Sequence, residues 1–234
     1  MTRGDSSAPV TLRGVSKTYG SHGHSCDALR DVTFTASRGE FSLLLGPSGS
    51  GKTTLLTLIA GFAPASSGVI RLFGSEIASY APRELQRLRA GRIGFIFQAF
   101  LLIDAFTVRE NVSLVPHFAG RDRASARQRT TDALERVGIA PLAGKRPYEL
   151  SHGERQRVAI ARAIANDADL LLADEPTASL EASQAEDIMR LLHSYAADAG
   201  KCVIVASHDL CLRDLADTIH HMEHGRLTTM DGAS

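Results

Sequence analysis

The chain has 234 residues and a formal net charge of zero, because 26 lysine and arginine residues balance 26 aspartate and glutamate residues. This length allows one large domain or two small ones with a sizeable core, and the neutral charge excludes an overall field that would draw the chain to nucleic acid. The three cysteines are irregularly spaced, which favours reduced thiols and a cytosolic setting over a disulfide framework. The polar N-terminus lacks a signal-peptide core and no apolar run approaches the roughly 20 residues of a spanning helix, so any membrane role is expected to need a partner.

Short apolar runs alternate with turns over residues 9–45, which predicts a small β-rich layer ahead of the core. Tyr19 lies at the edge of this layer, where its ring could stack on a base or could simply be half-buried. The next loop places His22, His24 and Cys26 at alternate positions, and these side chains could bind a metal. A solvated loop is the favoured interpretation, because no fourth ligand or helical pair accompanies them.

Residues 41–54, FSLLLGPSGSGKTT, form the strongest motif in the chain. An apolar run suited to one buried strand is followed by a glycine-rich loop and then by an amphipathic run that ends near Gly61. The loop has the pattern G-x-x-x-x-G-K-T, whose inward-facing N–H groups and helix N-terminus favour a polyphosphate. Lys52 can reach the β- and γ-phosphates, and the Thr53 hydroxyl can bind Mg²⁺. The predicted phosphate-binding residues are Gly46, Pro47, Ser48, Gly49, Ser50, Gly51, Lys52, Thr53 and Thr54.

The middle of the chain predicts a strand at 69–73, a helix at 82–90 and a strand at 93–97 that ends at Gln98. The stretch from residue 99 to about 150 is rich in Ala, Arg and Glu and predicts an inserted helical subdomain. Its arginines at 121, 123, 127 and 129 could form a basic patch. A solvated helix face is favoured, because no aromatic residues interleave with them.

The last third alternates helices with strands: a helix at 151–165, a buried strand at 169–175, a helix at about 181–196 and a strand at 202–206. Ser151 and Glu154 have capping-box spacing at the start of the first helix. The alternation predicts an α/β fold with a parallel sheet covered on both faces. Ligand sites of such sheets lie at the carboxyl ends of the strands, where the glycine loop, Gln98, Asp174, Glu175 and His208 all fall.

Four polar side chains at these strand ends suit phosphate chemistry. Asp174 can hold Mg²⁺ directly or through water, and Glu175 can orient or deprotonate the water that attacks the γ-phosphorus. The two neighbouring side chains are expected to diverge from extended backbone. Gln98 can sense both metal and water, and His208 can stabilise charge on the γ-phosphate. Each residue alone would suit an ordinary surface role, but their joint occurrence after the loop indicates a catalytic set.

These motifs resemble those of the ATP-binding cassette (ABC) ATPases over about residues 9–230. The matching pieces are Tyr19 as the base-stacking aromatic, Gly46–Thr53 as Walker A, Gln98 as the Q-loop, Leu150–Glu154 as the signature, Leu170–Glu175 as Walker B, Ala178–Glu181 as the D-loop and His208 as the switch histidine. The resemblance implies one domain at 9–230 with a P-loop NTPase (RecA-like) core, a parallel sheet and an N-terminal antiparallel β layer. Approximately residues 9–98 and 160–230 form the layer and core, and 99–159 form an inserted helical subdomain with the signature.

The resemblance also implies that two copies stack head to tail around two ATP molecules. Each copy then offers Ser151, Gly153 and Glu154 to the ATP held by the other. The family signature usually reads Leu-Ser-Gly-Gly-Gln, so His152 adds bulk and Glu154 adds negative charge near phosphate, which is expected to loosen this contact. Glu154 could instead cap its own helix. Glu181 replaces the usual D-loop aspartate and is one methylene longer.

The function implied is that of the ATPase subunit of an ABC transporter, with Glu175, His208, Gln98 and Lys52 as catalytic residues and Thr53, Gln98 and Asp174 around Mg²⁺. A separate permease would dock near residues 98–108, in a groove that includes Phe100 and Leu102, and would hold the chain at the cytoplasmic face of the membrane. The ADEPT-x-x-L form and short length resemble the lipoprotein-release and macrolide-export type, which favours export or extrusion. The alternatives are an importer cassette, a soluble ABC ATPase of DNA repair or translation, and a P-loop kinase.

Overall fold

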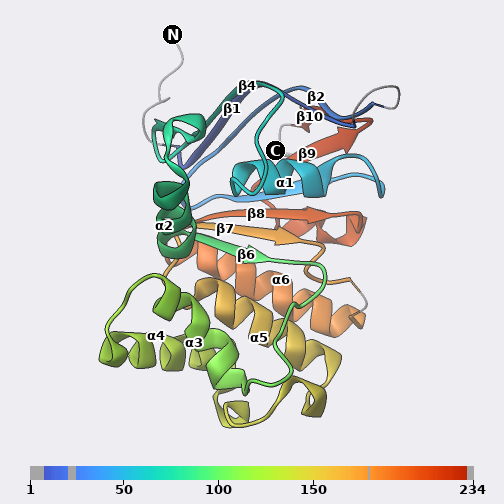
Figure 1. The fold of residues 1–234 in the computed structure, drawn as a ribbon. Coiled ribbons are helices and arrows are strands. Elements are labelled where there is room, and N and C mark those ends of the chain that lie inside the picture. Colours follow the sequence, from blue (N-terminus) through green and yellow to red (C-terminus); the bar gives the residue numbers. More distant parts are fainter. Residues whose placement is uncertain (1–7, 21–24, 179, 231–234) are drawn as a thin grey trace.

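The computed structural model describes residues 8–20, 25–178 and 180–230, so His22 and His24 lie outside the described residues. The described residues form two sheets, one with the order β2-β1-β4-β5 and one with the order β10-β9-β3-β8-β7-β6. In Figure 1, α1 (Lys52–Ile59) lies between the two sheets, while α5 (His152–Ile164) and α6 (Ala182–Ala197) cover the other face of the larger sheet. The predicted α/β architecture, with a parallel sheet covered on both faces, is therefore confirmed.

The smaller sheet is the predicted N-terminal layer and is antiparallel throughout. Its strands are β1 (Val10–Tyr19), β2 (Cys26–Ala36), β4 (Ser67–Leu72) and β5 (Ser75–Glu76). Val10 at the start of β1 pairs with Ala36 of β2 on one side and Leu72 of β4 on the other. The first two strands extend well beyond the short apolar runs that predicted them, because their solvent-facing residues are polar.

The larger sheet contains β3 (Phe41–Leu45), β6 (Ile93–Ile96), β7 (Leu170–Asp174), β8 (Cys202–Ser207), β9 (Thr218–Glu223) and β10 (Arg226–Met230). Every residue of β3, β7 and β8 is buried. Leu43 and Leu45 pack into one core cluster with residues of α5 and α6, whereas Leu44 packs into a second cluster with α1 and the smaller sheet. Successive side chains of a strand point to opposite faces, so a fully apolar strand fills both cores.

Helices fill the stretch that was predicted as a helical insertion. They are α3 (Val108–Phe118) and α4 (Arg123–Arg136), followed by α5, whereas α2 (Pro82–Arg92) is the separate helix predicted ahead of β6. Because α5 is one continuous helix, the expected subdomain boundary near residue 159 falls inside it. Within the described part of the chain, no helix combines the length and the apolar character needed to cross a membrane.

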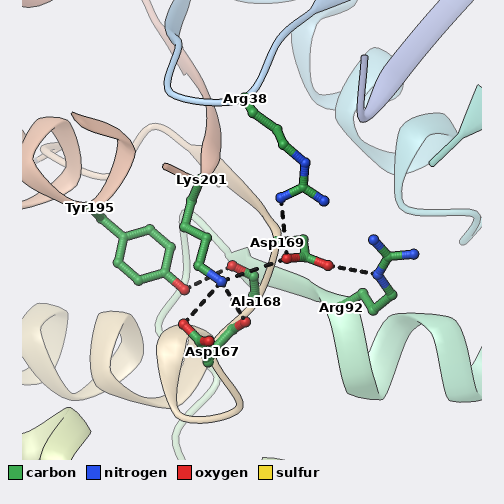
Figure 2. A network of polar contacts seen from close by, with 7 residues as sticks. All are labelled: Arg38, Arg92, Asp167, Ala168, Asp169, Tyr195 and Lys201. Carbon is green, nitrogen blue, oxygen red and sulfur yellow. Dashed lines mark hydrogen bonds and ion pairs between the residues drawn. The ribbon is translucent and has the colours of Figure 1, made fainter. Parts of the chain in front are cut away.

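A charged network ties together the amino ends of the central strands, at the edge of the sheet opposite the glycine loop. Asp169, just before β7, accepts a 2.7 Å hydrogen bond from Arg92, and Arg38 and Lys201 lie 3.5 and 3.6 Å from its other carboxylate oxygen. Figure 2 shows the three cationic side chains converging on this one carboxylate. Burial alone would raise the pKa of Asp169, but the hydrogen bond and charge of Arg92, with the charges of Lys201 and Arg38, hold it below its usual value.

Candidate active site

The glycine loop joins the carboxyl end of β3 to α1 and forms one wall of a cleft of about 490 Å³. Gly51 has a φ of 110°, and a Cβ there would lie 2.5 Å from the carbonyl oxygen of Ala28. At Gly46 a Cβ would lie 2.1 Å from the carbonyl oxygen of Met222. The backbone therefore passes so close to β2 and β9 that only glycine fits, which leaves the loop N–H groups free to face a ligand.

Lys52 is buried at the base of the cleft, at the first residue of α1. Its ammonium donates to the carbonyl oxygens of Gly46 and Pro47 at 2.6 and 3.1 Å and lies 3.5 Å from Glu175 Oε1. These contacts hold the ammonium inside the loop at the N-terminus of α1. The positive charge of Lys52 and the helix N-terminus both favour an anionic ligand.

Thr53 and Asp174 meet at the carboxyl end of β7. The Thr53 hydroxyl donates to Asp174 Oδ2 at 2.8 Å, while the buried Oδ1 atom has no hydrogen-bond partner among the described residues. Burial and the nearby charge of Glu175 raise the pKa of Asp174, against the opposing effects of the Thr53 hydrogen bond and the Lys52 charge. A carboxylate oxygen without a partner, beside a hydroxyl group, fits a hard cation that prefers oxygen ligands.

Glu175 leaves β7 in a conformation that the sequence did not predict. Its φ is 48°, so the extended backbone expected at this residue is wrong; the two acidic side chains diverge because the chain turns after Asp174. The Glu175 N–H donates to the carbonyl oxygen of Ala206 on β8 at 2.9 Å, which anchors the turn. The side chain lies with Oε2 2.9 Å from His208 Nδ1, at the mouth of the cleft. A non-glycine residue in this strained region is typical of a functional site.

The structure thus brings the predicted catalytic set together around one cleft. Lys52, Thr53, Gln98, Glu175 and His208 all line it, and Asp174 reaches it through Thr53. Tyr19 does not line the cleft. It pairs with Cys26, which does, and its half-exposed ring carries the Lys17 ammonium 4.9 Å from its centroid.

Sequence reasoning missed a turn that braces the glycine loop. The hairpin between β9 and β10 contains His224 and Gly225, and both line the cleft. The Gly225 N–H donates to the carbonyl oxygen of Ser50 at 3.0 Å, and its own carbonyl accepts from the Arg30 N–H at 2.8 Å. Gly225 has a φ of 76°, and a Cβ would lie 2.8 Å from the carbonyl oxygen of Ala28. Gly225 by itself signals a turn here but does not identify the strands on either side of it.

The rest of the cleft wall comes from β2, where Cys26, Asp27, Ala28 and Arg30 line it. Of the three residues of the metal-binding alternative, Cys26 lines the cleft, and His22 and His24 lie outside the described residues. In the part of the chain that the structure does describe, no three His, Cys, Asp or Glu side chains group as a metal site.

The signature residues lie at the start of α5 and do not line this cleft. Ser151 is the N-cap of α5: its hydroxyl accepts from the Glu154 N–H at 3.3 Å, and the Glu154 carboxylate accepts from the Ser151 N–H at 2.7 Å. The backbone and hydroxyl groups of Ser151 lower the pKa of Glu154. The capping box predicted from spacing is confirmed, so Glu154 does serve its own helix. A Cβ at Gly153 would lie 3.0 Å from Gln184 of α6.

Docking of a permease near residues 98–108 stays a prediction, and the structure shows which side chains of this segment are exposed. Phe100 and Leu102 are half-buried, the first against the ring of His152 and the second against the main core. The exposed apolar side chains of this segment are instead Leu101 and Ile103, exposed by 58% and 42%. A groove between α3 and α4 adjoins it, lined by Phe106, Leu114 and four arginines, Arg109, Arg121, Arg123 and Arg127.

Of the D-loop residues, Ser179 lies outside the described residues. Glu181 is the exposed residue that precedes α6, and its side chain makes no capping hydrogen bond to that helix.

Comparison with known proteins agrees with this geometry. The family model described as ABC transporter matches residues 29–178. The Macrolide export ATP-binding/permease protein MacB of Rhodopseudomonas palustris is 38% identical over 92% of this chain and 33% of its own length. The Methionine import ATP-binding protein MetN of Caulobacter vibrioides is 37% identical over 93% of this chain and 65% of its own. The chain thus spans about one third of the first of these relatives and two thirds of the second.

A solved structure matches the chain almost end to end. The ATP-binding cassette MJ0796, in a dimeric post-hydrolysis state bound to ADP and Pi, superposes with a TM-score of 0.89 at 34% identity, covering 96% of this chain and 99% of that one. A second dimeric structure of the same cassette superposes with the same TM-score.

Proposed function

This chain is an ATPase cassette of the ABC transporter family, and we propose that it binds and hydrolyses Mg-ATP to drive a separate membrane permease. The observation that carries the proposal is that three groups meet at one cleft. They are a glycine loop with a buried lysine, a Thr53–Asp174 pair in which one carboxylate oxygen has no hydrogen-bond partner among the described residues, and a Glu175–His208 pair.

Thr53 and Asp174 are the residues that would hold Mg²⁺, and Gln98 lines the same cleft. When bound, the ion would neutralise phosphate charge and polarise the γ-phosphoryl group. Tyr19 is proposed to stack on the base from the rim of the cleft, close to Cys26.

Lys52 stabilises the β- and γ-phosphates by exchanging its bonds to the loop carbonyls for bonds to phosphate oxygens. Glu175 accepts a proton from the attacking water or holds that water in line, because its carboxylate is fixed between Lys52 and His208. His208 can then donate to the γ-phosphate as charge develops there. Gln98 orients the water and senses the metal.

Ser151, Gly153 and Glu154 are proposed to complete the site of a second copy, since none of them lines the cleft of their own chain. The MJ0796 cassette is dimeric in its post-hydrolysis state, which supports a head-to-tail pair with two ATP molecules.

The permease is proposed to dock on the segment 98–108 and the adjoining α3–α4 groove, where exposed Leu101 and Ile103 offer apolar contact. The chain would then lie at the cytoplasmic face of the membrane, peripheral through this partner. Export or extrusion is the proposed direction, supported by the MacB relative, which is named as a macrolide export protein. The MetN relative makes an importer the competing direction.

The Glu175→Gln variant tests the proposal, because it keeps the size of the side chain while removing the base. We expect it to bind Mg-ATP, to lose hydrolysis and to accumulate as a dimer that size-exclusion chromatography with light scattering detects. The matched control is Glu76→Gln, at an exposed glutamate on β5, which should hydrolyse ATP normally. Normal turnover by Glu175→Gln would contradict the assigned role. Co-purification of the native permease and identification of what stimulates hydrolysis would separate export from import.

A further inference from the structure

The segment that follows Gln98 has no regular secondary structure until α3 begins at Val108, yet it is firmly attached to α5. The Arg162 guanidinium donates from Nη1 to the carbonyl oxygen of Leu101 and from Nη2 to that of Phe100, each at 2.6 Å. Two short charge-assisted bonds from one planar group fix position and orientation together. Burial lowers the pKa of Arg162, a cost that these bonds offset.

A second contact joins the same segment to the other end of the helix. The Phe100 ring meets the His152 ring edge to face, with ring centroids 4.7 Å apart and planes at 71°. His152 is the first residue of α5 and Arg162 lies ten positions later, about 15 Å along the helix. The long Arg162 side chain points back toward the N-terminus of α5, which shortens this separation. Phe100 can therefore meet Arg162 through its backbone carbonyl and His152 through its ring.

The residues next to these two rings in the sequence belong to two different nucleotide sites. Gln98, two residues before Phe100, lines the cleft for the chain's own nucleotide. Ser151 and Gly153, which flank His152, are proposed to meet the nucleotide of the second copy. The Phe100–His152 pair therefore connects, within one chain, a residue that senses one nucleotide to the residues that complete the other site.

We propose that His152 and Phe100 are positioning residues that couple Gln98 to the signature turn, with Arg162 holding the Phe100 backbone in place. This inference rests on the proposed head-to-tail dimer. In this view the bulk of His152 serves a contact within its own chain. Removing the His152 ring should therefore weaken ATP-driven dimer formation and not strengthen it.

The test measures ATP-driven dimerisation of the full chain in the Glu175→Gln background. His152→Ala and Phe100→Leu should each raise the ATP concentration for half-maximal dimerisation about two- to tenfold, the range expected for one aromatic pair. The double variant should resemble either single variant, because both break the same contact. His152→Phe should restore dimerisation, since a phenyl ring can keep the edge-to-face contact.

Two further measurements separate coupling from other effects. Binding of a fluorescent ATP analogue to the monomer should remain unchanged in every variant, because the cleft is intact. His193→Ala, which removes from α6 the ring that lies 5.8 Å from the Phe41 ring centroid, is the control for loss of a histidine–aromatic contact elsewhere and should dimerise normally.

Several outcomes would overturn the inference. Additive effects in the double variant would mean that His152 acts on the partner's nucleotide directly. Tighter dimerisation by His152→Gly would mean that bulk obstructs the site. A parent chain that fails to dimerise with ATP would remove the proposed function itself, whereas a parent that dimerises and a His152→Ala variant that matches it would remove only the coupling.

Discussion

Substitution of Glu154 tests how much its capping hydrogen bond stabilises the start of α5. Its carboxylate accepts a 2.7 Å hydrogen bond from the Ser151 N–H in the first turn of α5. The Glu154→Gln variant keeps the shape and an acceptor but removes the charge. Charge-assisted hydrogen bonds are about twice as strong as neutral ones, and an acidic residue at a helix N-terminus gains about 0.3–1 kcal/mol from the helix dipole. We therefore expect the free energy of unfolding to fall by about 0.5–1 kcal/mol at pH 7.

Thermal unfolding would show this loss as a midpoint lower by about 1–4 °C for a chain of this size. The loss should also depend on pH. Because its bonds to Ser151 lower the pKa of Glu154 in the folded chain, the carboxylate stabilises the fold above the unfolded pKa, and this contribution disappears as the pH falls through the folded pKa. The difference in unfolding free energy between the natural chain and the Glu154→Gln variant should therefore close in acid.

Glu110→Gln provides a matched control, because Glu110 forms the same capping box with Thr107 at the start of α3 and has a lowered pKa for the same reason. It should lose stability with the same sign but leave ATP-driven dimerisation unchanged. Equal stability of Glu154→Gln and the natural chain at pH 7 would refute the capping argument and would leave nucleotide contact as the reason for this residue.

Lys52→Ala should abolish ATP turnover, because the buried ammonium is the positive charge of the loop; near-normal hydrolysis would reject the Walker A assignment. Gly225→Ala should weaken binding of a fluorescent ATP analogue, because a Cβ would lie 2.8 Å from the Ala28 carbonyl oxygen and displace the brace on Ser50; unchanged affinity would contradict that role. Asp169→Asn should lower the free energy of unfolding by on the order of 2 kcal/mol at pH 7. The loss should be smaller in acid, because the pKa of Asp169 is lowered in the folded chain and its stabilising charge disappears as the pH falls through that pKa. Urea titrations at both pH values would measure this, and an equal loss in acid would refute it.

The sequence predicted the central sheet well because its strands are buried on both faces. An apolar run such as Phe41–Leu45 leaves few alternatives when a glycine loop follows it, and Leu170–Asp174 and Cys202–Ser207 have the same character. The positions of the proposed catalytic side chains then follow from the rule that parallel strands end at one edge of the sheet.

The hairpin β9–β10 was beyond this reasoning, because its pattern is polar. His220 lies on β9 and is buried with its ring 4.8 Å from that of Phe34, a residue far earlier in the chain that no local pattern connects to it. The position of β9 therefore depends on burial against residues distant in the sequence, and not on an alternation of apolar and polar residues along the strand. The brace on the glycine loop was missed for the same reason, since Gly225 lies far from Ser50 and Arg30 in the sequence and meets them only in the folded chain.

Conformation at the site was harder to predict than identity. Glu175 follows a buried strand, and extended backbone is the natural expectation, yet the residue has a φ of 48° and bonds to β8 through its N–H. A left-handed glutamate has no signature in composition or periodicity, and it persists because the neighbouring strand fixes it. The same limit applies to Phe100: an aromatic residue after a strand was expected to line a docking groove, and no local pattern indicated that its ring contacts His152, which is distant in the sequence. In both cases the residue type indicated the site, and only tertiary contacts determined which way the side chain faces.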